Sequence, residues 1–117
     1  MAARRPKFWL WMNMALWRYL MASSVLANCA AAAANAEVVA EISRLPWSGF
    51  GPGTEGGKAK PEIWKEQAKF KELSERLMAD TDKLVLGAKA GNLDALKAAV
   101  GAAGDTCKTC HDTFRNK

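Results

Sequence analysis

The segment LDALKAAVGAAGDTCKTCHDTF, residues 93–114, decides the fold of this chain. Its apolar residues recur at steps of three and four, a spacing that places side chains along one face of an α-helix. Asn92 is suited to cap the start of that helix, and Gly101 and Gly104 either weaken it or allow close approach of a neighbour. The residues of the apolar face are Leu93, Leu96, Val100, Ala103, Cys107, Cys110 and Phe114.

Two cysteines of this face belong to a Cys-x-x-Cys-His motif, formed by Cys107, Cys110 and His111. The motif is typical of covalent c-type haem attachment. Each thiol adds to one vinyl group of the porphyrin, and the histidine binds the iron. His111 is the single histidine of the sequence, which excludes ligation by two histidines and zinc sites of the His-x-x-x-His kind. A helix that directs these three side chains into a bundle core suits a buried haem.

Other interpretations of the cysteines stay open. A redox dithiol of the thioredoxin kind needs a strand–helix context, and none is visible. A zinc site needs four ligands, and the distant Cys29 would complete only a strained set. Cys29 is most simply a small apolar helix residue, with lipid attachment or an intersubunit disulfide as alternatives. A haem-free helical metal or redox module therefore remains as an alternative from a different functional class.

Two more helices and a loop precede the motif helix. Residues 30–45 show one apolar face and end before Pro46. Residues 46–60 are rich in glycine and proline and predict a loop whose Trp47 and Phe50 pack back on the core. A long helix is predicted from Pro61 to about Gly91. Its apolar face contains Phe70, Leu73, Leu77, Leu84 and Ala88, interrupted by Thr81.

The N-terminal segment, residues 1–36, has two interpretations. Arg4, Arg5 and Lys7 precede an almost wholly apolar run over residues 8–27, and small residues follow, which is the order of an export signal. The same run could instead form a first helix that is hydrophobic on most sides. A membrane anchor is disfavoured because Arg18 near its centre would cost roughly 2.5–3.5 kcal/mol. The predicted organisation is a signal-like segment or divergent first helix over residues 1–36, and a helical bundle domain over residues 30–117.

Composition agrees with one small helical domain. Half of the residues are hydrophobic, and no segment shows the alternation of a strand. Residues 1–36 contain four basic and no acidic residues, and residues 37–117 contain 13 basic and 12 acidic residues. Most of the net +5 charge therefore comes from the N-terminal segment. The near-neutral body, residues 37–117, has no basic patch with interleaved aromatics, which argues against a nucleic-acid partner. The prediction is an all-α four-helix bundle with an atypical N-terminal helix.

Several residues could complete the environment of an iron. Arg115 follows His111 by four residues, so it either stabilises the helix C-terminus or lies in the proximal pocket and tunes the iron. Methionine thioethers are candidates for a sixth ligand, although methionine more often fills a core. The candidates are Met12, Met14, Met21 and Met78.

From about residue 35 to residue 117 the chain resembles the cytochrome c′ family, the class II c-type cytochromes. The segments that carry the resemblance are NAE at 35–37, LPWSGFGPGTEGG at 45–57, KPEIW at 60–64, GNLD at 91–94 and CKTCHDTFR at 107–115. The resemblance implies a four-helix bundle with one covalent haem c near its end. It also implies Cys107 and Cys110 as thioether anchors, His111 as the axial iron ligand and Arg115 as the proximal-pocket arginine.

The resemblance further implies a periplasmic, often homodimeric protein that is not an enzyme. Such proteins bind CO and NO at a five-coordinate iron, or transfer electrons to small redox proteins. A low-spin electron carrier with Met12 or Met14 as the sixth ligand is the alternative. The first 30 residues depart from the family pattern, so no distal residue is assigned.

Overall fold

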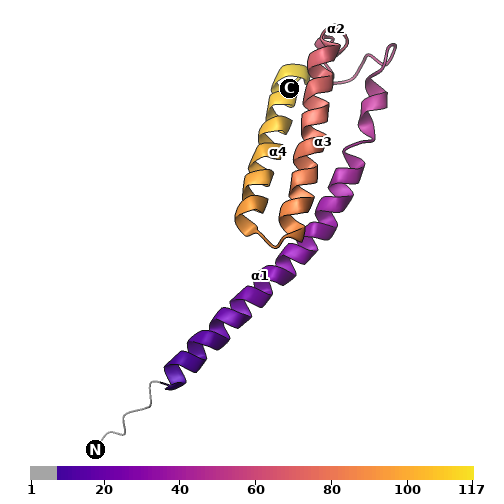
Figure 1. The fold of residues 1–117 in the computed structure, drawn as a ribbon. Helices are drawn as coiled ribbons and strands as arrows, with labels where there is room; N and C mark the ends of the chain where they lie inside the picture. The colour runs from indigo at the N-terminus through magenta and orange to yellow at the C-terminus, as the bar shows by residue number, and fades with distance from the viewer. Residues whose placement is uncertain (1–7) are drawn as a thin grey trace, which may run out of the picture.

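The computed structural model describes residues 8–117, and within them the chain is helical with no strand. Two helices, α3 and α4, form an antiparallel pair, and α1 packs on α3 from the other side (Figure 1). The predicted all-α class is confirmed. The elements are α1 (Phe8–Ile42), the 3-10 helix η1 (Pro46–Phe50), α2 (Glu62–Lys65), α3 (Gln67–Lys89) and α4 (Leu93–Phe114).

The turn between α3 and α4 forms where the sequence predicts it. Gly91 has a positive φ of 65°, a conformation that costs glycine little. The Asn92 side chain then accepts a hydrogen bond from the Ala95 backbone N–H at 3.0 Å and caps α4. The predicted start of the motif helix is confirmed.

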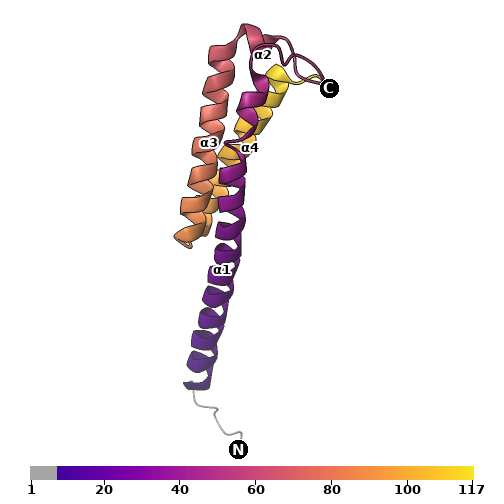
Figure 2. The same cartoon turned by 90° about the vertical axis from the view of Figure 1, so that its right-hand side faces the viewer.

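The N-terminal run and residues 30–42 form one continuous helix, α1, rather than two helices. No glycine or proline interrupts residues 8–42, and the alanine run from Ala30 to Ala34 has the highest helix propensity. The C-terminal half of α1 packs on α3, whereas its N-terminal half projects beyond the bundle (Figure 2). The molecule is therefore 87 Å long and only 24 by 20 Å across. None of the helices within residues 8–117 has the length and apolar character needed to cross a membrane.

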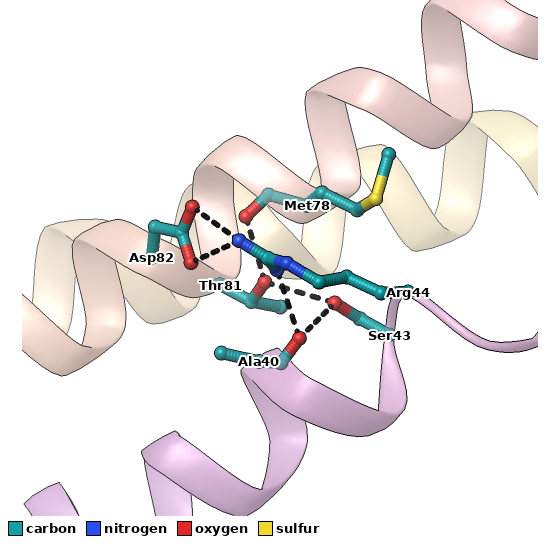
Figure 3. A network of polar contacts seen from close by, with 6 residues as sticks. All are labelled: Ala40, Ser43, Arg44, Met78, Thr81 and Asp82. Carbon is teal, nitrogen blue, oxygen red and sulfur yellow. Dashed lines mark hydrogen bonds and ion pairs between the residues drawn. The ribbon is translucent and has the colours of Figure 1, made fainter.

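A polar network fastens the end of α1 to α3 (Figure 3). Ser43 Oγ and Thr81 Oγ1 lie 3.2 Å apart, and both Asp82 carboxylate oxygens accept from Arg44 Nη2 at 2.9–3.0 Å. Arg44 Nη1 also donates to the Ala40 carbonyl, one of the last carbonyls of α1. Thr81, which interrupts the predicted apolar face of its helix, is thus the hydroxyl that faces α1.

The helix predicted to begin at Pro61 is broken. Glu66, with φ −112° and ψ 47°, separates α2 from α3. The bend allows Ile63 to be buried in the core, and Trp64 Nε1 donates to the Gly51 carbonyl at 3.0 Å. The tertiary contacts of Ile63 and Trp64 therefore stabilise the break at Glu66 more than one uninterrupted helix from Pro61 would be stabilised by its backbone hydrogen bonds.

One glycine lets α3 and α4 approach closely, and it is Gly87. A Cβ at this position would lie 3.1 Å from the Leu96 backbone nitrogen. No atom of the described residues lies within 4 Å of a Cβ built at Gly101 or Gly104. Within the described part of the chain, no other helix approaches Gly101 or Gly104 closely, and the close approach of a porphyrin stays a prediction.

Candidate functional site

A pocket of about 440 Å³ lies at the end of the bundle where α4 finishes. Its walls come from η1, the loop before α2, α2 itself, α3 and the last two turns of α4. The lining is mostly apolar. Two stretches far apart in the sequence, residues 46–77 and 106–115, therefore build one site.

Aromatic rings form the inner wall of the pocket. Phe70 is at the centre, with ring centroids at 5.9 Å from Trp47, 4.9 Å from Phe50 and 5.5 Å from Phe114. Phe114 is only 2% exposed and packs in a core with Ile63 and Leu73. The predicted return of Trp47 and Phe50 onto the core is confirmed.

All three motif residues line this pocket, because α4 presents Cys107, Cys110 and His111 to it. Both thiols are free; Cys107 is exposed and Cys110 half-buried. Burial raises the pKa of the Cys110 thiol, and the neighbouring Cys107 adds to that rise. Two thiols and an imidazole on one wall of an apolar pocket are the donor set that the motif predicts.

A short backbone clip holds the end of α4 against the loop before α2. The Lys60 N–H donates to the Phe114 carbonyl at 2.9 Å, and the Asn116 N–H donates to the Lys58 carbonyl at 2.8 Å. Ala59 and Arg115 form an isolated antiparallel bridge between these bonds. The clip brings Lys58 to the pocket. The sequence could not indicate this position, because the loop that contains Lys58 has no periodic pattern.

Arg115 lies close to His111, but it follows the last residue of α4 instead of belonging to that helix. It is the C-cap of α4 with extended φ −115° and ψ 131°, and its N–H donates to the His111 carbonyl at 3.0 Å. Arg115 and His111 line both the pocket and a second hollow of about 500 Å³, which Lys60, Asp112 and Lys117 also border. Arg115 is therefore next to the imidazole, and its proposed influence on an iron stays a prediction.

An exposed ion pair lies on the same turn of α4. Lys108 donates a hydrogen bond to Asp112. This bond and the attraction between the two charges raise the pKa of Lys108 and lower the pKa of Asp112.

The sequence did not indicate a buried polar pair just below the motif. Thr106, 1% exposed, donates through Oγ1 to Asp80 Oδ2 at 2.7 Å. Lys83 Nζ approaches the other carboxylate oxygen at 3.7 Å. Thr106 lines the pocket directly before Cys107, so this pair ties the motif to α3.

Three of the four methionine candidates, Met14, Met21 and Met78, do not line the pocket. Met14 and Met21 are exposed on the projecting half of α1, and Met78 is not among the lining residues. The Met12 side chain lies outside the described residues.

The alternatives for Cys29 lose support, since Cys29 is buried, and an exposed thiol would be needed for an intersubunit disulfide. Among the residues that the structure describes, no three His, Cys, Asp or Glu side chains lie close enough to hold a metal ion. A zinc module of protein ligands alone therefore finds no site in residues 8–117.

The pocket fits a flat apolar ring that carries carboxylates. Trp47 Nε1 is buried and has no hydrogen-bond partner among the described residues. A buried indole N–H normally has an acceptor. Lys58 and Arg115 add positive charge to the same wall. Haem has an apolar macrocycle and two carboxylates, so the residues present match its chemistry.

Comparison with protein families decides the assignment. A family model described as Cytochrome C′ matches residues 12–115. The chain belongs to the cytochrome c′ family. Proteins of this family carry a covalent haem c with iron, so the resemblance and the cofactor predicted from the sequence are confirmed.

Curated relatives support the assignment. Cytochrome c′ of Alcaligenes xylosoxydans xylosoxydans is 51% identical over 84 residues, which are 72% of this chain and 66% of that protein. Cytochrome c′ of Rubrivivax gelatinosus is 44% identical over 89 residues, 74% of this chain and 69% of that one. The matched region thus spans about two thirds of the length of these relatives.

Solved cytochrome c′ structures have the same fold. A recombinant native protein from Alcaligenes xylosoxidans superposes with a TM-score of 0.74 at 37% identity, covering 91% of this chain and 94% of that one. A nitric oxide complex of a variant from the same organism gives 0.74 at 40% identity, covering 85% and 87%. Cytochrome c′ structures are four-helix bundles, so the predicted bundle class is confirmed, with the first helix of this chain continuous with the second.

Proposed function

We propose that this protein is a haem c protein that binds neutral diatomic gases, NO and CO, at a five-coordinate iron and exchanges electrons with small redox proteins. The observation that carries the proposal is the pocket wall on which Cys107, Cys110 and His111 lie together. Among the residues that the structure describes, no methionine lines the pocket. The nitric oxide complex of a family relative gives independent support.

The chain's own residues would hold the cofactor in three ways. The Cys107 and Cys110 thiols would each be joined to a vinyl group, with a C–S bond formed and the thiol hydrogen taken up by the other vinyl carbon. His111 would offer an imidazole nitrogen to the metal. The Trp47 N–H and the Lys58 and Arg115 cations offer partners for carboxylates.

Haem c supplies an iron that changes between ferrous and ferric states and can bind a small ligand at a free axial position. The protein controls access to that position. The aromatic wall around Phe70 would exclude water from the pocket. Arg115 would add positive charge beside the His111 imidazole. We infer a carrier or gas-binding role rather than an enzymatic one, as the resemblance to the cytochrome c′ family implies.

The test uses protein expressed in a periplasmic strain that attaches haem c. Intact mass should show one covalent haem, and the reduced protein should bind CO rapidly with a shift of its Soret band. Cys107→Ser with Cys110→Ser should abolish the covalent adduct. His111→Ala should keep the thioethers but change the ligation spectrum.

The low-spin alternative gives the opposite spectra. An oxidised protein with the methionine–iron charge-transfer band, and a reduced protein that excludes CO, would establish a sixth ligand and overturn the open-site proposal. Met14→Leu should leave all spectra unchanged, because Met14 is exposed in this structure. A protein without covalent haem under the same conditions would return the haem-free module to consideration.

Two finer statements belong to the same proposal. We infer a periplasmic location and a homodimer, because the resemblance of residues 35–117 to the cytochrome c′ family implies both. Cell fractionation with haem staining tests the location: cytoplasmic holoprotein contradicts it. Light scattering of the holoprotein tests the dimer.

A further inference from the structure

One side of the bundle is apolar and uncovered within the described residues. On α1, Val39 and Ile42 are exposed, and helical spacing places them on the side of the helix away from Glu37, which forms an ion pair with Lys89 of α3. On α4, Val100 is 56% exposed although it belongs to the predicted apolar face. We call Val39, Ile42, Leu93 and Val100 the open side.

The open side extends along α4 toward the pocket. Leu93, Val100 and Cys107 are spaced by seven residues, two helical turns, so they lie in one row. Ala99, Ala103 and Thr106 are instead buried, and Thr106 bonds to α3. The apolar face predicted for α4 is thus wider than α3 covers. Because Cys107 also lines the pocket, the open side runs up to the pocket.

The projecting half of α1 is apolar without a partner. Trp17 is 65% exposed, and apart from Arg18 most of its neighbours on the helix are also large and apolar. A helix segment that is hydrophobic on most sides is normally covered, and a cluster of exposed large apolar side chains marks an interaction site. The exposed residues are Met14, Leu16, Trp17, Tyr19, Leu20 and Met21.

We propose that the projecting half of α1 from a second copy packs on the open side, and that the two copies exchange these halves reciprocally. Cys29 is the first buried residue of α1 among those described, so residues 8–28 project. At 1.5 Å per residue they span about 30 Å, close to the roughly 33 Å of α4. The projecting segment therefore matches the open side in both length and apolar character.

Symmetry allows both open sides to be covered at once. A twofold axis across α1 near residue 28 would place the two α1 helices antiparallel, with Trp17 of one copy near Val39 of the other. Such an isologous contact closes on itself. A fold-back within one chain would instead have to break a helix with no glycine or proline between residues 8 and 42. Exchange keeps α1 intact, which favours the second copy as the occupant.

The proposal concerns the assembly of the site as well as its oligomeric state. Since the open side ends at Cys107, the second copy would border the pocket and complete its wall. This inference rests on the proposed homodimer and specifies how it forms. It also requires that residues 8–28 remain in the mature protein.

Crosslinking separates exchange from its alternatives. Leu16→Cys and Val39→Cys are placed together in a Cys29→Ser background, and the purified holoprotein is treated with a short bis-maleimide. Within one straight α1 these positions are about 35 Å apart. Exchange predicts a covalent dimer on a denaturing gel, crosslinked at both symmetric positions. A dimer by light scattering whose crosslink stays within each chain keeps the homodimer and overturns exchange.

Surface variants provide the second measurement. Val100→Glu and Trp17→Glu should each convert the dimer to monomer, with an unchanged haem content that reports an intact fold. Leu86→Glu is the matched control, because Leu86 is 67% exposed on α3 and lies about 200° around the helix from the inward Leu84. Leu86→Glu should stay dimeric. A monomeric wild-type holoprotein, or an intact mass lacking the projecting segment, overturns the proposal.

Discussion

Replacing Thr106 by valine tests the buried pair that ties α4 to α3. The substitution keeps the branched shape and removes the hydroxyl that donates to Asp80 at 2.7 Å. Asp80 is buried, and its other oxygen has only a distant lysine at 3.7 Å. A hydrogen bond to a charged group contributes about 1.5–3 kcal/mol, so Thr106→Val should lower the free energy of unfolding by that amount.

The assay is urea unfolding of the holoprotein followed by circular dichroism at one protein concentration. With a slope near 1.5 kcal/mol per molar urea, the midpoint should fall by about 1–2 M while the slope stays unchanged. Thr113→Val is the control, since Thr113 lies on the same helix and its hydroxyl donates only to the Thr109 carbonyl. It should change the midpoint by much less.

A double-mutant cycle with Asp80→Asn then isolates the pair. If the hydrogen bond carries the effect, the two substitutions should be strongly non-additive, because each one removes the same contact. Additive losses, or a Thr106→Val midpoint equal to that of Thr113→Val, would refute the assignment of stability to this bond.

Two further predictions concern helix packing and thiol access. Gly87→Ala should destabilise the protein by about 1–3 kcal/mol, because the new Cβ would lie 3.1 Å from the Leu96 backbone nitrogen. Gly101→Ala is the control: its Cβ would meet no neighbouring atom within 4 Å, so the change should be neutral or stabilise the protein by up to about 1 kcal/mol. Thermal melts compare the two, and equal shifts would contradict the close approach. In haem-free protein, iodoacetamide should modify the exposed Cys107 before Cys110, as mass spectrometry of timed samples would show. Burial raises the pKa of Cys110, so its rate should gain more from an increase in pH, and modification of Cys110 first would contradict this order.

The candidate site was predictable because its chemistry is local in sequence. Cys107, Cys110 and His111 lie within five residues, and helical periodicity alone places both thiols on one face. The turn at Gly91 and the cap at Asn92 are also local, since each depends on the conformation and side chain of a single residue. These features needed no knowledge of the rest of the chain.

Other features depend on which elements become neighbours. Thr81 weakens the apolar pattern of its own helix, and its role emerges only where Ser43 meets it from α1. The break at Glu66 likewise arises because Ile63 and Trp64 find tertiary partners. Propensity and periodicity describe one segment at a time and cannot register such contacts.

The sequence by itself determined the helical class, the start of α4 and the residues predicted to anchor a haem, because these follow from short-range spacing and from the chemistry of two thiols and one imidazole. The tertiary structure decided the rest. It joined the first helix to the second, clipped residues 58–60 to the end of α4, and buried Asp80 against Thr106. It also left an apolar side uncovered. These outcomes depend on contacts between residues far apart in the chain, which no local pattern encodes.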